Sequence, residues 1–173
     1  MHCSCVRQTE LPHTTPLLRD VLYHPDQVAR FYGNHLHDLD AALAAAREID
    51  FPAEKRSALV AALRVGNPDT EALRRLAEPG TVAVVTGQQV GLFSGPAYTV
   101  YKALTAVKLA ETLTANGVSA VPVFWLATED HDFAEVNHAW LFDANHRPNK
   151  LEMRRPANSQ PAGEVSLVAP PVR

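Results

Sequence analysis

Two short segments of the sequence concentrate side chains that could do chemistry. The first, residues 86–96, is rich in glycine and holds two glutamines: Gly87, Gln88, Gln89, Gly91 and Gly95. Glycine lets the backbone approach a ligand closely, and a glutamine amide both donates and accepts hydrogen bonds. The glycine spacing matches neither the dinucleotide fingerprint nor the Walker phosphate loop, so it predicts no nucleotide by itself. The alternative is an ordinary glycine-rich turn between a strand and a helix.

The second segment, residues 128–138, is acidic around a histidine. Four of the seven residues from Glu129 to Glu135 are carboxylic acids, and His131 lies among them. Like charges repel one another, so such a cluster is typical of a place that binds a cation or an ammonium group, or that moves a proton. His131 beside Asp130 or Asp132 is therefore a candidate general base. The alternative is that one aspartate caps the next helix and the other carboxylates are solvated.

A divalent metal would need ligands that converge on one point. His131 and His138 are seven residues apart, which on a continuous helix separates them by roughly 10.5 Å along the axis. This is too far for one ion, and only a loop between the two histidines would bring them together. We therefore predict no metal site, and a metal-dependent hydrolase built on residues 129–138 stays as an alternative.

Two further polar side chains follow the glycine-rich segment. Tyr98 and Lys102 are four residues apart, so on a helix both can lean toward its N-terminal end. Lys102 could there neutralise a carboxylate or phosphate of a substrate. The alternative is a tyrosine half in the core and a lysine on the surface.

The elements that must position these segments are two strands and the helix between them. Residues 82–85 and 121–127 are continuous apolar runs, typical of strands covered on both faces. An apolar stripe between them predicts a helix that starts at Pro96 and is closed by Asn116 and Gly117. This order predicts a right-handed parallel unit, and ligands of such sheets bind outside the carboxyl ends of the strands. We therefore expect the glycine-rich and acidic segments to face one another.

The rest of the chain divides into three parts. Residues 1–25 are irregular by composition, residues 26–79 form a helical region, and residues 80–173 form an α/β core. Apolar spacing and capping residues predict helices over 26–46, 50–65 and 70–78. After the acidic segment, a helical turn and strand are predicted over 135–143, with weaker strands at 150–153 and 164–168.

Composition excludes several classes of protein. The chain has 173 residues, and 16 Lys+Arg against 19 Asp+Glu give a net charge of −3 without a basic block, which argues against nucleic-acid and membrane-surface binding. No apolar run approaches the ~18–20 residues of a membrane span, and the first 25 residues lack a signal-peptide pattern. Cys3 and Cys5 are too close together to staple distant segments. These features predict a cytoplasmic protein.

Two long motifs resemble those of a known family. TGQQVGLFSGPAYTVYKA at residues 86–103 is followed by VPVFWLATEDHDF at 121–133 and EVNH at 135–138. In this order and separation they resemble the BshC family, cysteine ligases of bacillithiol biosynthesis. The resemblance implies an α/β fold with a Rossmann-like parallel sheet after an N-terminal helical region. Family members are several hundred residues long, so the chain resembles their N-terminal part only, with an incomplete core.

The family's reaction implies roles for the two segments. It joins the carboxyl group of L-cysteine to the amine of glucosaminyl-malate, which forms bacillithiol in the last step of the pathway. A carboxylate does not acylate an amine unaided, so we expect ATP as the activator. Asp130, His131 or Asp132 is expected to take the proton or hold the amine. The expected substrate-binding positions are Gly87, Gln88, Gln89, Gly91, Gly95, Tyr98, Lys102, Glu129, Asn137 and His138.

Two parallel strands alone leave unpaired edges and an uncovered apolar face. We therefore expect Phe124, Trp125 and residues 82–85 to be partly exposed, and the 173-residue chain to be inactive by itself. A homo-oligomer is considered only for the family-length form. A non-catalytic module that binds a small molecule is the alternative function.

Overall fold

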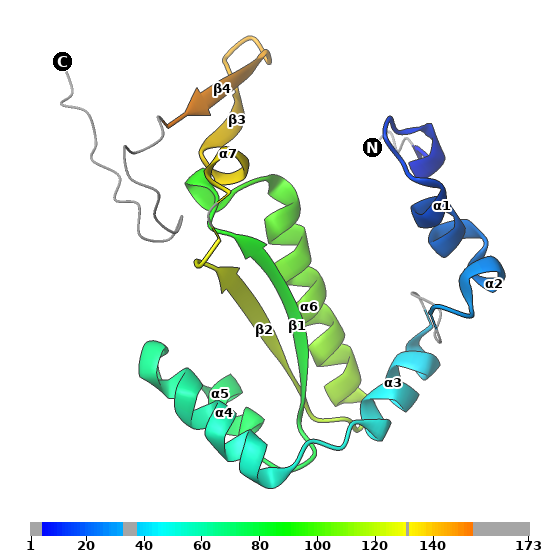
Figure 1. Cartoon of the computed structure of the whole chain (residues 1–173), viewed down its shortest axis with the longest axis vertical. Coiled ribbons are helices and arrows are strands. Elements are labelled where there is room, and N and C mark those ends of the chain that lie inside the picture. Colours follow the sequence, from blue (N-terminus) through cyan, green and yellow to red (C-terminus); the bar gives the residue numbers. More distant parts are fainter. Residues whose placement is uncertain (1–4, 33–37, 131, 154–173) are drawn as a thin grey trace. The chain divides into compact units, whose positions relative to one another are not determined.

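The structure is a computed structural model that describes residues 5–32, 38–130 and 132–153 (Figure 1). Its internal contacts divide the chain into two units, Met1–Ile49 and Asp50–Arg173. Within the described ranges, every helix is too short or too polar to cross a membrane.

The described part of the first unit contains short helices, and α1 and α3 each begin at a side-chain cap. Its elements are a 3-10 helix η1 (Gln8–Glu10) and the helices α1 (Pro16–Tyr23), α2 (Pro25–Val28) and α3 (Leu39–Glu48). The prediction that residues 1–25 are irregular is therefore wrong at α1. Pro16 is acceptable in the first turn of a helix, and Thr15 accepts a hydrogen bond from the backbone N–H of Leu18 at 3.2 Å.

The predicted continuous helix over 26–46 is also wrong. Helix α2 ends at Val28, and α3 begins at Leu39 after an N-cap residue, Asp38, whose backbone is extended. Asp38 Oδ1 accepts hydrogen bonds from the backbone N–H groups of Asp40 and Ala41 at 3.0 and 3.2 Å. A helix cannot run through its own N-cap, so Asp38 starts a new helix there.

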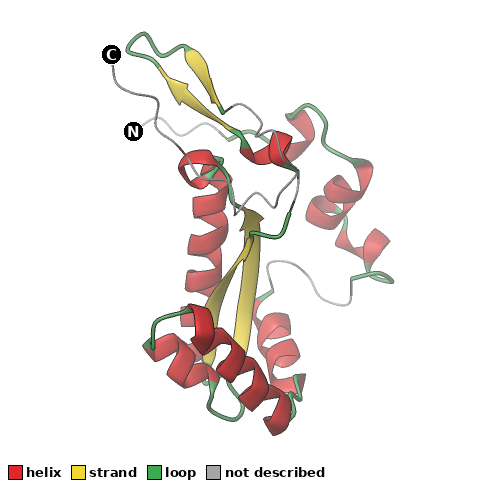
Figure 2. Cartoon of the chain, turned by 60° about the vertical axis from the view of Figure 1, so that its left-hand side comes forward, coloured by secondary structure: helices red, strands yellow, loops and turns green. Residues whose placement is uncertain are grey.

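The second unit is built on a parallel pair of strands. Strand β1 (Val82–Gln89), helix α6 (Ala97–Ala115) and strand β2 (Ala120–Ala127) follow one another, and α6 packs against both strands (Figure 2). The strands pair from Val82 opposite Ala120 to Gln89 opposite Ala127. This confirms the predicted strand, helix and strand. However, β1 runs four residues beyond the predicted segment because its pairing with β2 continues to Gln89.

Two helices before β1 bring an apolar cluster against the start of β2. Helices α4 (Ala53–Gly66) and α5 (Glu71–Leu76) contribute buried side chains that pack with Val121 of β2: Val60, Leu73 and Leu76. Arg56 of α4 is also buried, and its Nη1 donates to the carbonyl oxygens of Leu76 and Thr81 at 2.9 and 2.8 Å. Arg56 therefore ties the end of α5 to the residue before β1.

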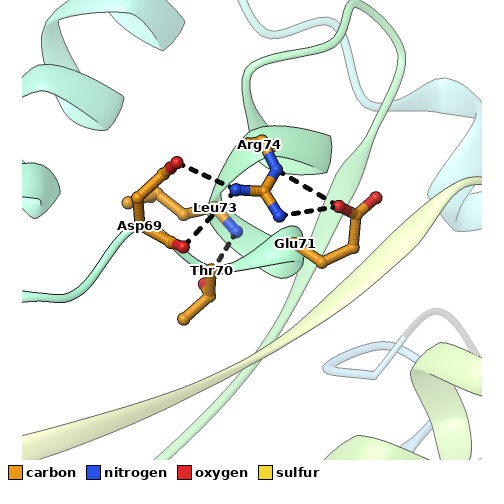
Figure 3. A network of polar contacts seen from close by, with 5 residues as sticks. All are labelled: Asp69, Thr70, Glu71, Leu73 and Arg74. Carbon is orange, nitrogen blue, oxygen red and sulfur yellow. Dashed lines mark hydrogen bonds and ion pairs between the residues drawn. The ribbon is translucent and has the colours of Figure 1, made fainter.

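Polar contacts determine where α5 begins (Figure 3). Thr70 Oγ1 accepts a hydrogen bond from the backbone N–H of Leu73 at 3.2 Å. Arg74 Nη2 donates to Glu71 Oε2 at 3.1 Å and Nη1 donates to Asp69 Oδ2 at 2.8 Å. These bonds, that to Glu71 first, raise the pKa of Arg74 above its ordinary value. The cap starts the helix at a point that turns Leu73 into the apolar cluster.

The sheet is buried at one end and open elsewhere. Val121 is 1% exposed, whereas Val85 is 62% and Trp125 57% exposed. The prediction that both faces of the strands are covered is therefore wrong for the described residues. The expectation of a partly exposed apolar face is confirmed for Phe124, Trp125 and residues 83–85 but not for Val82, which is buried.

The 173-residue chain is expected to bind an apolar fluorescent dye such as anilinonaphthalene sulfonate, because contiguous exposed apolar side chains offer it a surface. The double variant Val85→Lys/Trp125→Lys should lower the fluorescence gain. Val65→Lys is the matched control, since Val65 is 90% exposed on α4. Equal dye fluorescence in the double variant and the control would contradict this prediction.

The last described elements follow the carboxyl end of β2. A short helix α7 (Phe133–Val136) leads into the antiparallel pair β3 (His138–Phe142) and β4 (Pro148–Glu152). The turn between these strands closes on Asp143 Oδ1, which accepts from the backbone N–H groups of Asn145 and Arg147 at 2.8 Å each. The helical turn and strand predicted over 135–143 are confirmed, and β4 overlaps the strand predicted at 150–153. The strand predicted at 164–168 lies outside the described residues.

Candidate functional site

The site lies where the two parallel strands end. Gln89 is the last residue of β1, and its Nε2 donates to Asp130 Oδ2 at 3.1 Å and to Glu135 Oε2 at 3.0 Å. Asp130 follows β2, and Glu135 lies on α7. The carboxyl ends of neighbouring parallel strands meet at one edge of a sheet, so the structure brings the glycine-rich and acidic segments into direct contact.

A second set of bonds continues along β1 to helix α6. Lys102 Nζ donates to Gln88 Oε1 at 2.9 Å, and Gln88 Nε2 donates to Gln89 Oε1 at 2.9 Å. The same Nζ lies 5.9 Å from the centre of the Tyr98 ring. Both glutamines stand on the strand itself and not in the loop after it, because β1 is longer than predicted. Lys102 is half-buried and held against Gln88, unlike a lysine exposed at the surface.

The side chains of Gln88, Gln89 and Tyr98 line a cavity of about 460 Å³, a size typical of small-molecule sites. Its polar lining residues are Gln88, Gln89, Glu135 and His138. Its aromatic lining residues are Phe93, Tyr98 and Trp140, all of them exposed. An aromatic wall beside amides and a carboxylate suits a small polar molecule that also has an apolar or ring-shaped part.

The glycines of the first segment are required by close backbone contacts. A Cβ on Gly91 would lie 2.6 Å from Gly95 Cα, and one on Gly87 would lie 2.7 Å from the carbonyl oxygen of Trp125. Gly95 has a φ of +73°, and Phe93 and Ser94 before it also have positive φ values. Non-glycine residues rarely adopt this conformation, so the turn stores strain beside the cavity.

Gly87→Ala is expected to lower the free energy of unfolding by about 2 kcal/mol, because the new methyl group meets backbone atoms of β2 that cannot move alone. Chemical denaturation followed by circular dichroism measures the change. Gly66→Ala is the control, since a Cβ there has no atom within 4 Å and alanine favours the helix. Equal effects of the two substitutions would contradict the steric argument.

Asp132 borders the Gln89 contact, since its backbone N–H donates to Asp130 Oδ1 at 2.8 Å, whereas Glu129 lies in a different groove. Asp132 Oδ1 accepts a hydrogen bond from the backbone N–H of Glu135 at 3.3 Å, so Asp132 caps α7 as the alternative interpretation proposed. Glu129 is exposed and lines a different groove of about 680 Å³ between β2 and helices α4 and α5. The structure therefore does not place Glu129 with the other predicted binding residues.

Asn137 and His138 lie at the junction of α7 and β3. Asn137 is buried, and its Nδ2 donates to the carbonyl oxygen of Met153 at 3.2 Å, which joins this junction to the end of β4. Its Oδ1 lies 3.1 Å from His138 Nδ1. Asn137 therefore supports the structure around the site, while the half-buried His138 lines the cavity. His131 lies outside the described residues.

Comparison with known proteins identifies the family. Residues 1–170 match the family described as "Bacillithiol biosynthesis BshC, N-terminal Rossmann-like domain". The chain belongs to the BshC family. The match confirms the predicted α/β fold, in which a Rossmann-like core with a parallel sheet follows an N-terminal helical region.

Several relatives share the name "Putative cysteine ligase BshC". The protein of Solibacter usitatus (strain Ellin6076) is 69% identical over 172 residues, which are 99% of this chain and 33% of the relative. That of Koribacter versatilis (strain Ellin345) is 42% identical over 147 residues, 79% of this chain and 27% of the relative. The chain thus spans about a third of the length of the BshC relatives it matches.

Three residues of the candidate site could not be singled out from the sequence: Phe93, Glu135 and Trp140. Glu135 was visible as one of the four acidic residues of the second segment, but no pattern singled it out as a partner of Gln89. Phe93 lies inside the glycine-rich motif and was not considered. Trp140 lies on β3, and only the position of that strand brings it to the cavity.

No group of three or more His, Cys, Asp and Glu side chains is arranged to hold a metal ion in the described part of this BshC chain, which leaves out His131. The carboxylates nearest the cavity instead accept hydrogen bonds from an amide, as Asp130 and Glu135 do from Gln89.

Proposed function

We propose that this chain supplies the Rossmann-like part of a ligase that joins the carboxyl group of L-cysteine to the amine of glucosaminyl-malate, the last step of bacillithiol biosynthesis. The observation that carries the proposal is the contact of Gln89 with Asp130 and Glu135. It unites the two long family motifs beside a cavity of about 460 Å³. The name shared by the relatives supports cysteine as one substrate.

The reaction sets three chemical requirements. The amine must be neutral to attack, so its ammonium form loses a proton to a base. The carboxylate oxygen of cysteine must leave, and ATP would supply the phosphate or nucleotide group that makes it a leaving group. Finally, the two reactants must be held with the amine nitrogen and the carbonyl carbon in contact.

The residues of the site divide these tasks in our proposal. Gln88 and Gln89 bind and orient a polar substrate, because their amides lie at the cavity wall. Asp130 holds the amine or takes its proton, with His131 beside it as the other candidate base. Asp132 is less suited to this task because it caps α7.

The test is a family-length chimera that joins this chain to the remainder of the Solibacter usitatus relative. With L-cysteine, glucosaminyl-malate and ATP, mass spectrometry should detect a product that equals the sum of the two substrates less one water. Gln89→Ala, Asp130→Asn and His131→Ala should each slow its formation. Wild-type rates in all three variants would reject the proposed site.

The other functions give different results in the same experiment. A chimera that binds glucosaminyl-malate by calorimetry but forms no product would indicate a non-catalytic binding module. Hydrolysis of a substrate that stops when a chelator is added would indicate the metal-dependent hydrolase. Omission of ATP tests whether ATP is the activator, because no other component can drive amide formation in water.

A further inference from the structure

Five side chains at the site form one continuous line of hydrogen bonds. Lys102 Nζ donates to Gln88, Gln88 Nε2 donates to Gln89, and Gln89 Nε2 donates to Asp130 and Glu135. The separations of donor and acceptor atoms lie between 2.9 and 3.1 Å along the whole line. The line crosses from α6 over the end of β1 to the acidic segment after β2.

The charges at the two ends determine the direction of every bond in the line. A lysine ammonium group only donates, an ionised carboxylate only accepts, and a glutamine amide does both. Rotating the Gln88 amide by 180° would turn its NH₂ group toward the ammonium of Lys102. Rotating the Gln89 amide would turn its oxygen toward two carboxylates. Each rotation replaces attractive contacts with repulsive ones, so both amides are held in one orientation.

We propose that Lys102 and Glu135 are positioning residues, which act on the ligand through Gln88 and Gln89 by fixing the orientation of the two amides at the cavity wall. A free amide offers its donor and its acceptor with equal ease, whereas a fixed amide accepts only a ligand with the complementary pattern. Lys102 thus sets selectivity without being the group that neutralises a substrate anion. This inference takes only the identity of the ligand from the proposed function. The orientation of the two amides follows from the hydrogen bonds themselves.

The geometry favours this role for Glu135 over a role in folding. Glu135 is exposed on a helix of only four residues, and its carboxylate reaches across to β1 instead of capping α7. The cap of that helix is supplied by Asp132. Removing the Glu135 carboxylate should therefore free the Gln89 amide from one of its hydrogen bonds, while α7 still begins at its Asp132 cap.

Side-chain amide resonances of the ¹⁵N-labelled 173-residue chain test the inference directly. Lys102→Met removes the donor at one end, and Gln89 is not its direct partner. We expect the NH₂ signals of both Gln88 and Gln89 to shift and to exchange faster with water. Lys102→Arg keeps a donor and should preserve most of the wild-type pattern. Lys108→Met is the matched control on the exposed side of α6.

A second variant changes the acceptor at the other end of the line of hydrogen bonds. Glu135→Gln should change the NH₂ signals of Gln88 as well as those of Gln89, and Glu111→Gln is its control on α6. The inference is wrong if two results are found together. The NH₂ signals of Gln89 would change no more in Lys102→Met than in Lys108→Met. The NH₂ signals of Gln88 would change no more in Glu135→Gln than in Glu111→Gln. The two variants start at different ends, so loss of folding in one leaves the other informative.

Kinetics of the chimera separate this inference from the proposed function. Glu135→Gln is expected to lower kcat/KM about tenfold, the effect of one charge-assisted hydrogen bond, mainly through KM, and Glu135→Asp should restore part of the loss. A chimera without any ligase activity would reject the proposed function but leave the spectroscopic result intact. Glu135→Gln could change the NH₂ signals of both glutamines and yet leave KM unchanged. That result would overturn the link between amide orientation and substrate recognition.

Discussion

Gln89→Ala is expected to lower kcat/KM of the family-length chimera for cysteine addition about a hundredfold. The substitution removes the side chain that joins the end of β1 to both carboxylates of the acidic segment. It also leaves Asp130 and Glu135 facing one another without the N–H groups between them, and it frees the Gln88 amide. Initial rates from mass spectrometry at several substrate concentrations measure the change.

Two further variants define what this result means. Gln89→Glu keeps the size of the side chain but places a third carboxylate beside Asp130 and Glu135, so it should be at least as harmful as alanine. Gln27→Ala removes an exposed glutamine from α2 and should keep the wild-type rate. A Gln89→Ala enzyme as active as the Gln27→Ala enzyme would show that the contact plays no part in the reaction.

Arg56→Leu is expected to lower the free energy of unfolding by about 3 kcal/mol, a large fraction of the total stability of a small domain. Arg56 is only 7% exposed, and its guanidinium satisfies two buried carbonyl oxygens, those of Leu76 and Thr81. Leucine fills part of the space but leaves both oxygens without a donor. Denaturant unfolding followed by circular dichroism measures the loss.

The control for charge and surface effects lies on the same helix. Arg64→Leu removes an exposed arginine from α4 and should change stability by less than about 0.5 kcal/mol. Arg56→Lys keeps the positive charge but has no planar fork, so it should recover only part of the stability. If Arg56→Leu and Arg64→Leu were equally stable, the two buried hydrogen bonds would contribute no net stability.

The strands and the long helix of the core could be predicted because their signals are local. The apolar runs around Val84 and Val123 and the stripe along α6 lie within single elements, and the parallel pairing follows from their order. The break between α2 and α3 was missed because apolar spacing continued through it. Asp38 decided it, since a side chain that bonds the next N–H groups starts a helix regardless of the surrounding pattern.

The sequence alone also determined that the two chemical segments meet. One segment includes the carboxyl end of β1 and the other follows that of β2, and parallel neighbours end on the same side, so Gln89 and Asp130 were expected to be close. Part of the cavity lining was also predicted, namely Gln88, Gln89, Gly91, Gly95, Tyr98 and His138, because these residues belong to the glycine-rich and acidic motifs or stand next to them in the chain.

Only the tertiary structure decided which partner each side chain takes. The register of β1 against β2, the short helix α7 and the position of β3 place Glu135 against Gln89, bring Trp140 to the cavity, and direct Glu129 to another groove. Lys102 likewise reaches Gln88 because of how α6 packs on the sheet. Hydrogen bonds act over about 3 Å, so they depend on distances between elements that no local pattern of residues specifies.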